Sequence, residues 1–297
     1  MSSTTAPGTP APSAQPHERR TSTHAARDAR GWRAFGIAFL TVLVLIYGLP
    51  VFWMLSTSFK PQGELATGSW LPEAPTVQAY VNFFRTDFIP ALRNSAQLAA
   101  TTTVITLLLA VPAAYGVSAV RSRLVTPALI LLLVVQMIPT SATIVPMFRL
   151  LSQLGLIDTI LGVALAQCTL FVPFAVLILR PAFAGIPPDL EAAASLDGAS
   201  RLKYLVFIAL PMLRNSVIVT TAIVLVSSWG ELVYPLTFLL EEDKYPLSVY
   251  IAQSVGRFNN TWNLLMTVAV MASLPVFLIV LAAQRKLQSG VTLGAVK

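Results

Sequence analysis

Seven polar or aromatic side chains lie within or beside long apolar stretches of this 297-residue sequence, where they could contact a solute. Amide groups pair with hydroxyls, and aromatic rings pack against the apolar faces of hydroxylated ligands. Amides between apolar helices also hold those helices together, so each of these groups has a structural role as its alternative. The residues that could line a solute path are Asn94, Gln97, Gln136, Gln167, Trp229, Glu231 and Tyr234.

Glu231 is an acid within an apolar stretch that runs from Asn215 to Leu240. A carboxylate inside a membrane is costly and often functional, which favours an ion- or proton-coupled carrier. The position of Glu231 near one end of the stretch favours instead a structural contact, at the outer end or between subunits. A coupled carrier also needs further embedded acids or an inverted repeat, and neither is evident. Both roles of Glu231 stay open.

Residues typical of an enzyme site are missing from the apolar stretches of the sequence. Both histidines, His17 and His24, precede the first stretch, and Cys168 fits a small apolar helix position. We therefore expect no catalytic residue, no metal site and no cofactor bound by this chain. A P-loop sequence for binding ATP does not occur, so any ATP-driven process needs ATP and Mg on a separate subunit.

The composition of the chain is that of a membrane protein. Apolar residues make up 55% of the sequence and charged residues only 11%, whereas globular domains carry about 25% charged residues. So few charges cannot cover the surface of a soluble fold of this length. This excludes an ordinary cytosolic enzyme, a nucleic-acid-binding module and a disordered protein.

Six windows without charged residues are long enough to cross a bilayer as helices, which takes about 20 residues, the fifth only if Glu231 is tolerated near one end. Runs that are apolar on every face, such as residues 128–135, exclude the alternating strands of a β-barrel. We expect an all-α membrane domain over residues 32–297, after a disordered tail over residues 1–31 that is rich in Pro, Ser and Thr. The windows are 34–59, 94–120, 124–148, 159–179, 215–230 (continuing past Glu231 to 240) and 258–284.

The basic residues predict the orientation of these six spans. With the N-terminus inside, 14 of the 20 Lys and Arg residues fall on the inner side and six on the outer side. Because positive charge concentrates in cytoplasmic segments, both termini are expected in the cytoplasm. The net charge of +7 then reflects membrane topology, and no nucleic-acid partner is expected.

A short helix is predicted in the loop over residues 186–211, on the cytoplasmic side. Pro187 and Pro188, followed by Asp189 and Glu191, are typical of a helix start. Three alanines follow, and Gly198 is a suitable stop. A helix with such small side chains could dock closely on a partner, although a solvated loop with one helical turn fits these residues equally well.

Asp197-Gly198, a spacer of nine residues, and Ile208-Ala-Leu-Pro211 resemble the EAA loop of ATP-binding-cassette (ABC) importer permeases. Further matches, in the order and spacing of this family, extend the resemblance over residues 35–297. They point to the carbohydrate-uptake branch and its MalG-like inner-membrane subunit. They are residues 53–60, 94–95, 113–116, 146–159 and 284–297.

The resemblance implies a type I importer permease fold with six transmembrane helices in the bacterial cytoplasmic membrane. It implies a permease that carries a sugar or sugar-like solute inward by alternating access. The partners would be a second permease, two ATPase subunits, an extracytoplasmic solute-binding protein and membrane lipid. By resemblance, the ATPase would contact a tail with Gly290, Gly294 and Lys297, and a coupling loop with Glu191, Ala192, Ala193, Ala194, Asp197, Gly198, Ile208, Leu210 and Pro211.

The sequence departs from the family pattern at the glutamate of the coupling loop. Counted back from Gly198, the family's glutamate falls on Ala192, and Glu191 stands one residue earlier. One residue is about 100° around a helix, so Glu191 points in another direction unless the helix start is shifted. The sequence does not identify the solute, because the binding protein usually selects it in this family.

Overall fold

A computed structural model describes residues 21–84, 88–120, 122–257 and 262–295, which form helices and loops without a β-strand. The elements are α1 (Thr21–Ser58), the 3-10 helix η1 (Gln62–Thr67), α2 (Gln78–Phe83), α3 (Phe88–Ala119), α4 (Val125–Gln136), α5 (Thr140–Gln153), α6 (Ile160–Ala184), α7 (Pro188–Leu196), α8 (Arg201–Tyr204), the π-helix η2 (Leu205–Ala209), α9 (Leu210–Met212), α10 (Arg214–Gly230), α11 (Val233–Phe238), the 3-10 helix η3 (Glu242–Lys244), α12 (Leu247–Arg257) and α13 (Trp262–Ala295).

The chain divides into two compact units, residues 1–53 and 54–297, which are described separately. The first consists mainly of α1, whose apolar part, Phe35–Ser58, is long enough to cross a membrane. Because α1 begins at Thr21, it includes residues 21–31, which belong to the segment where the sequence predicts a disordered tail. This segment has no proline and is rich in alanine and arginine, which favour helix. Residues 1–20 of the predicted tail lie outside the described residues.

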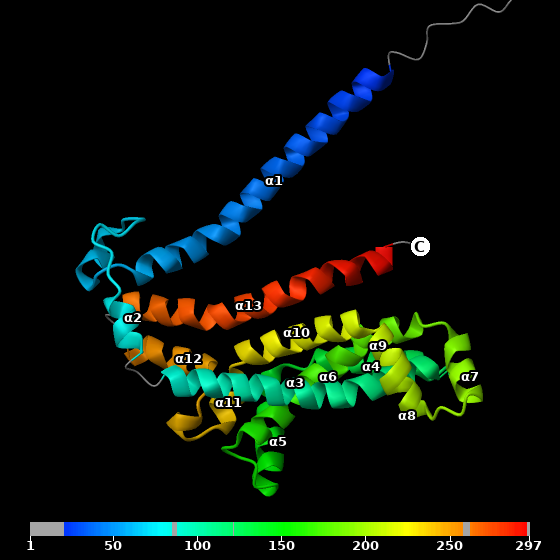
Figure 1. The fold of residues 1–297 in the computed structure, drawn as a ribbon. Coiled ribbons are helices and arrows are strands. Elements are labelled where there is room, and N and C mark those ends of the chain that lie inside the picture. Colours follow the sequence, from blue (N-terminus) through cyan, green and yellow to red (C-terminus); the bar gives the residue numbers. More distant parts are fainter. Residues whose placement is uncertain (1–20, 85–87, 121, 258–261, 296–297) are drawn as a thin grey trace, which may run out of the picture. The chain divides into compact units, whose positions relative to one another are not determined.

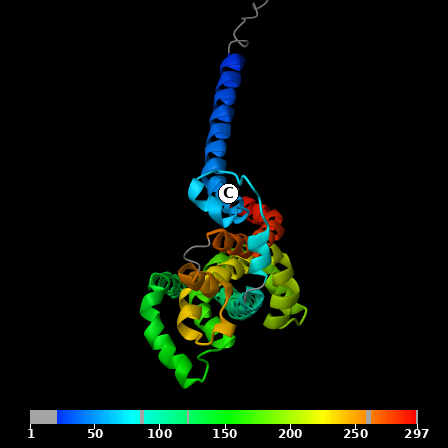
Figure 2. The ribbon, with the colours of Figure 1, turned by 90° about the vertical axis from the view of Figure 1, so that its left-hand side faces the viewer.

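A helical bundle forms the second unit, with α3 packed along α6 and α10 packed against both (Figures 1 and 2). Small side chains fill the contact between these helices, and Ala110, Ala114 and Ala175 are completely buried there. Such residues let helix backbones approach closely. α13 lies along α10, and α4 lies against α6. The result is a narrow core that fixes the positions of α3, α6 and α10.

Four helices in the described part of the chain are long and apolar enough to cross a membrane, or up to six if each of two bent pairs is one span. α4 and α5 meet at 94° where the window 124–148 predicts one span. Pro139 explains this bend, because a proline disfavours the helical conformation of the preceding residue. The stretch Arg201–Met212 meets α10 at 84°, with Leu213 in a non-helical conformation between them.

A second helical run follows α7 in the same loop. It begins at Arg201 and includes Pro211 in α9. The side chain of Ser200 caps the start by accepting a hydrogen bond from the N–H of Lys203 at 3.4 Å. α7 and α8 lie together at one end of the bundle, and α2 and α12 lie at the other (Figure 1). The predicted docking helix thus lies at one end of the bundle.

Candidate functional site

The helix predicted in the coupling loop is α7, and its limits follow from local residue types. Pro187 is extended at the N-cap, Pro188 occupies the first turn, and Asp189 and Glu191 lie in that turn, where carboxylates suit the helix dipole. α7 ends at Leu196, and Gly198 has a φ of +81°. Glycine adopts this left-handed conformation at little cost. The predicted start and stop of this helix are therefore confirmed.

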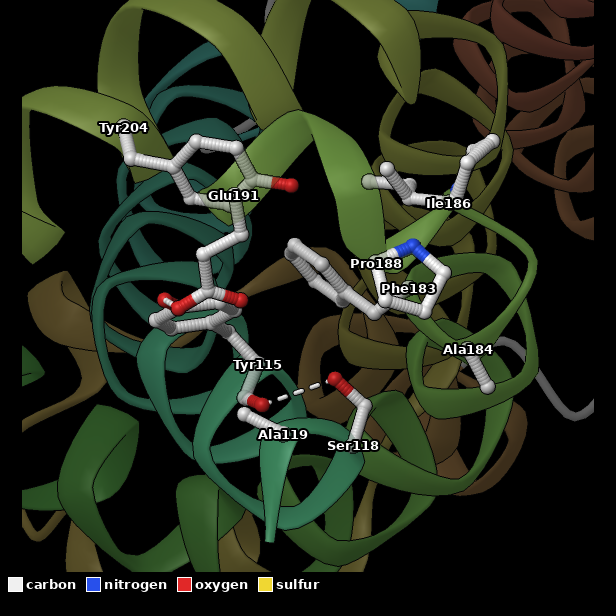
Figure 3. Close-up of a pocket in the computed structure, with 10 residues that line it drawn as sticks. Tyr115, Ser118, Ala119, Phe183, Ala184, Ile186, Pro188, Glu191 and Tyr204 are labelled. Carbon is white, nitrogen blue, oxygen red and sulfur yellow. Dashed lines mark hydrogen bonds between the residues drawn. The ribbon is translucent and has the colours of Figure 1, made fainter. Parts of the chain in front are cut away.

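Glu191 faces its own bundle (Figure 3). The hydroxyl of Tyr115, on α3, donates a hydrogen bond to Glu191 Oε1 at 2.5 Å. The Tyr115 ring also contacts Phe183 on α6, with centroids 5.9 Å apart, and Tyr204 on α8 at 6.0 Å. A cavity of about 250 Å³ lies beside this group and reaches Pro187. The end of α3 thus meets α6, α7 and α8 around one tyrosine.

The other residues predicted to contact the ATPase divide between an exposed face and the core. The inward-facing residues are Ala194, which is buried, and Ile208 and Leu210, which pack against the same core cluster. The exposed residues are Ala192, Ala193, Asp197, Gly198 and Pro211.

Leu196 belongs to the exposed face of α7 but was missed in the sequence analysis. Its side chain is 90% exposed. A signal was present, because Leu196 follows Ala192 and Ala193 by four and three residues, the spacing of one helix face. In the tail, Gly290 and Gly294 lie within α13, and Lys297 lies outside the described residues.

Gln167 lies at the centre of a buried polar cluster in the bundle. This side chain on α6 is completely buried. Its Oε1 accepts hydrogen bonds from Thr102 Oγ1 on α3 at 2.9 Å and from Ser228 Oγ on α10 at 2.5 Å. Its Nε2 donates to Glu231 Oε2 at 3.2 Å. One amide therefore joins the three central helices to Glu231.

Glu231 separates α10 from α11, where the sequence predicts a continuous stretch to Leu240. Its backbone is extended, with ψ 129°. Its Oε1 accepts hydrogen bonds from the backbone N–H groups of Val233 at 2.8 Å and Tyr234 at 3.3 Å, at the start of α11. Tyr234 is completely buried, and its hydroxyl bonds Thr143 on α5 at 2.8 Å. These contacts favour the structural role of Glu231.

The structure brings three of the seven predicted path residues together: Gln167, Glu231 and Tyr234. Asn94 is buried at the start of α3, and its Nδ2 donates to the carbonyl oxygen of Asp243 at 2.7 Å. Trp229 packs against a separate apolar cluster at the same end. Gln97 and Gln136 are exposed, and Gln136 Nε2 donates to the carbonyl of Leu170 at 2.7 Å. The part that the seven residues play in a solute path stays a prediction.

Asp158 joins two loops at the end of the bundle opposite α7, a contact missed in the sequence analysis. Its Oδ1 accepts hydrogen bonds from the N–H groups of Leu240 at 2.8 Å and Glu241 at 3.2 Å, and its Oδ2 pairs with Lys244 Nζ at 2.5 Å. Its own N–H donates to the carbonyl of Phe238 at 2.8 Å. The φ of Asp158 is +61°, a conformation in which Asp and Asn are enriched among residues other than glycine.

The pKa of Asp158 is lowered although burial alone would raise it. The hydrogen bonds from Lys244 and from the N–H groups of Leu240 and Glu241 favour the ionised carboxylate and outweigh burial. Hydrogen bonds to Asp158 and Glu241 raise the pKa of Lys244 in turn. The ion pair is therefore charged across the neutral pH range.

Comparisons with known proteins find a matching family and similar sequences over most of the chain. Residues 106–293 match the family described as binding-protein-dependent transport system inner membrane component. The trehalose transport system permease protein SugB of Mycobacterium tuberculosis (strain CDC 1551 / Oshkosh) is 32% identical, over 92% of this chain and 99% of SugB. The sulfoquinovosyl glycerol transport system permease protein SmoH of Agrobacterium fabrum (strain C58 / ATCC 33970) is 30% identical, over 86% of this chain and 91% of SmoH.

A solved structure shares the fold. It is a chain of a bacterial ABC transporter involved in the import of the acidic polysaccharide alginate. The TM-score is 0.76 at 22% sequence identity, and the match covers 87% of this chain and 97% of that one. At this identity the likeness shows the fold alone.

Proposed function

This chain belongs to the family of binding-protein-dependent transport system inner membrane components, and we propose that it carries a sugar or sugar-like solute into the cytoplasm. The family predicted from the EAA-like loop is thereby confirmed. The chain is a multi-pass permease of the bacterial inner membrane and not an enzyme, and ATP hydrolysis belongs to a separate subunit.

The observation that carries the sugar proposal is the similarity to SugB, which extends over nearly the whole of both chains. Other relatives are named for diacetylchitobiose and for arabinooligosaccharides, namely DasC of Streptomyces coelicolor (strain ATCC BAA-471 / A3(2) / M145) and AraQ of Bacillus subtilis (strain 168). These solutes share closely spaced hydroxyl groups on rings. We therefore propose a saccharide as the solute.

The proposed topology has six spans with both termini in the cytoplasm, each bent pair counting as one span. The distribution of Lys and Arg supports this orientation. It places α7 on the cytoplasmic side and the Asp158–Lys244 ion pair on the outer side, and these lie at opposite ends of the bundle. In this topology α7 faces the side where an ATPase would dock, and the loops joined by Asp158 and Lys244 face the side where a solute-binding protein would dock.

The proposed partners are a second permease, two ATPase subunits that hold ATP and Mg, and an extracytoplasmic binding protein. α7 has the features of a docking helix, because Ala192, Ala193 and Leu196 are exposed on it while Ala194 and Glu191 attach it to the bundle. Closure of the ATPase pair would move α7 and change which side of the membrane the path faces. The tail with Gly290, Gly294 and Lys297 is proposed as a second ATPase contact.

The secondary-transporter alternative has weaker support. It needs Glu231 to bind and release a proton or ion, but the Glu231 carboxylate caps the start of α11 and accepts a hydrogen bond from Gln167. Loss of that charge would weaken contacts that position α11. A structural carboxylate is the more economical explanation of this geometry.

Purification of the tagged chain from its source membranes in mild detergent tests the proposal. Mass spectrometry should identify an ATP-binding-cassette ATPase and a second permease in the same complex. The ATPase should be lost when residues 187–199 are replaced by a flexible linker of equal length. Recovery of the chain alone, able to move saccharides into liposomes without ATP, would contradict the proposal.

A further inference from the structure

We infer that the hydrogen bond between Tyr115 and Glu191 is the link through which movement of α7 reaches α3. The inference rests on the proposed function, in which an ATPase displaces α7. It makes Glu191 a positioning residue that faces its own chain, and it assigns a role to Tyr115, whose pairing with Glu191 no sequence pattern predicts.

α7 has only nine residues, so few of its side chains can hold it to the bundle. Ala194 is buried in the core cluster, and Glu191 bonds Tyr115 at 2.5 Å. A hydrogen bond to an ionised carboxylate is roughly twice as strong as one between neutral groups. The neighbouring cavity of about 250 Å³ means that close packing does not restrain this side of α7. The polar contact is therefore the main candidate for transmitting force.

Tyr115 is well placed to receive that force. Its ring contacts those of Phe183 and Tyr204, which limits how far the hydroxyl can swing without moving its backbone. Tyr115 is four residues before the end of α3 at Ala119, about one helical turn. A displacement of Glu191 therefore acts on the last turn of α3.

α3 can carry the displacement further, because it packs along α6 and α10. Thr102, on α3, donates to Gln167 Oε1 at 2.9 Å, and Gln167 Nε2 donates to Glu231. A continuous set of contacts thus connects α7 with the polar cluster around Gln167. Contiguity alone does not establish coupling, so the first step of this connection needs a direct test.

Glu191 and the exposed residues of α7 point in different directions, so docking on an ATPase and contact with α3 involve different faces of this helix. Ala192 is one residue further along, about 100° around the helix, and it is exposed. Ala192, Ala193 and Leu196 are available to an ATPase while Glu191 is held by Tyr115. Loss of the Tyr115–Glu191 bond should therefore leave docking intact and interrupt only the transmission to α3.

The test compares hydrogen–deuterium exchange of the purified complex in lipid nanodiscs, with and without ATP and vanadate. In the wild type, trapping should change exchange both in α7 and in residues 113–119 of α3. Tyr115→Phe and Glu191→Ala should keep the ATPase and the change in α7 but lose the change in residues 113–119. Glu191→Gln should retain the change in residues 113–119, because an amide oxygen still accepts a hydrogen bond from the Tyr115 hydroxyl.

Tyr204→Phe is the matched control, since it removes a neighbouring hydroxyl and leaves the Tyr115–Glu191 bond in place. It should behave as the wild type. A change in residues 113–119 that persists in Tyr115→Phe would overturn the inference. So would loss of the ATPase from Glu191→Ala but not from Tyr115→Phe, because Glu191 would then be an ATPase contact. A wild-type preparation without any ATPase would contradict the proposed function itself.

Discussion

Gln167 joins three helices through one side chain, so its replacement should destabilise the bundle. Gln167→Leu removes the hydrogen bonds with Thr102, Ser228 and Glu231. Hydrogen bonds between membrane helices average about 0.6 kcal/mol, so losing three should cost about 2 kcal/mol. For a domain of this size, we expect the melting temperature in detergent to fall by roughly 5 °C.

Gln97→Leu provides the control for this substitution, because Gln97 is exposed and the chemical change is the same. Its melting temperature should stay within about 1 °C of the wild type, as for surface substitutions generally. Equal melting temperatures for the two variants would show that the buried amide does not stabilise the bundle.

Asp158 should stabilise the two loops that it joins in a pH-dependent way. Its pKa is lowered in the folded chain, so folding favours the ionised form. Its contribution is therefore present above the pKa of an unfolded aspartate, about 3.9, and is lost as the pH falls through the lower folded value. Asp158→Asn tolerates the same positive φ but removes the charge that pairs with Lys244.

Thermal unfolding of the wild type and Asp158→Asn at a series of pH values measures this contribution. The wild type should melt at the higher temperature at pH 7, and the difference should shrink only below about pH 4. A difference that disappears between pH 6 and pH 8 would assign the effect to another titrating group.

Among the elements, α7 depends on the conformation of Gly198. Its φ is +81°, and a Cβ placed there would meet no atom within 4 Å. A larger residue is therefore disfavoured by the backbone and not by a clash, at a cost of about 1–2 kcal/mol. Gly198→Val should displace the end of α7 and reduce ATPase co-purification at least fivefold, while membrane insertion continues.

Two further variants separate conformation from side-chain volume. Gly198→Asn should keep most of the ATPase, because asparagine tolerates the left-handed conformation. Gly185→Ala should be neutral, since a Cβ there would lie 3.4 Å from the carbonyl oxygen of Ala182, close to ordinary contact. If Asn and Val at position 198 reduce the ATPase equally, the backbone explanation is wrong.

Elements that begin and end at prolines or glycines could be predicted from the sequence, and α7 is the clearest example. Pro187, Pro188 and Gly198 act within a few residues, so the sequence located this helix. The angle of 94° between α4 and α5 could not be predicted, because a charge-free window reports length and polarity but not direction. The bond of Tyr115 with Glu191 joins residues 76 positions apart, and no pattern in a single sequence reports such a pairing. The same holds for the pairing of Asp158 with Lys244.

At the scale of the whole molecule, the energy source distinguishes the importer from a coupled carrier. Uptake of a radiolabelled saccharide such as trehalose, or of others from a panel of disaccharides and oligosaccharides, should require ATP and the binding protein. It should persist when a protonophore collapses the proton gradient at constant ATP. The chain has a single acid, Glu231, within its apolar stretches, so the two mechanisms make opposite predictions for one substitution.

Glu231→Gln is that substitution. In the importer its amide oxygen can still accept the N–H groups of Val233 and Tyr234, so α11 keeps its cap and uptake should stay within about threefold of the wild type. A proton-coupled carrier would lose uptake completely, because glutamine cannot titrate. Glu231→Leu removes the cap as well, and in the importer it should lower uptake further than Glu231→Gln. Complete loss in Glu231→Gln, with the ATPase still bound, would make the charge itself essential and reopen the carrier mechanism.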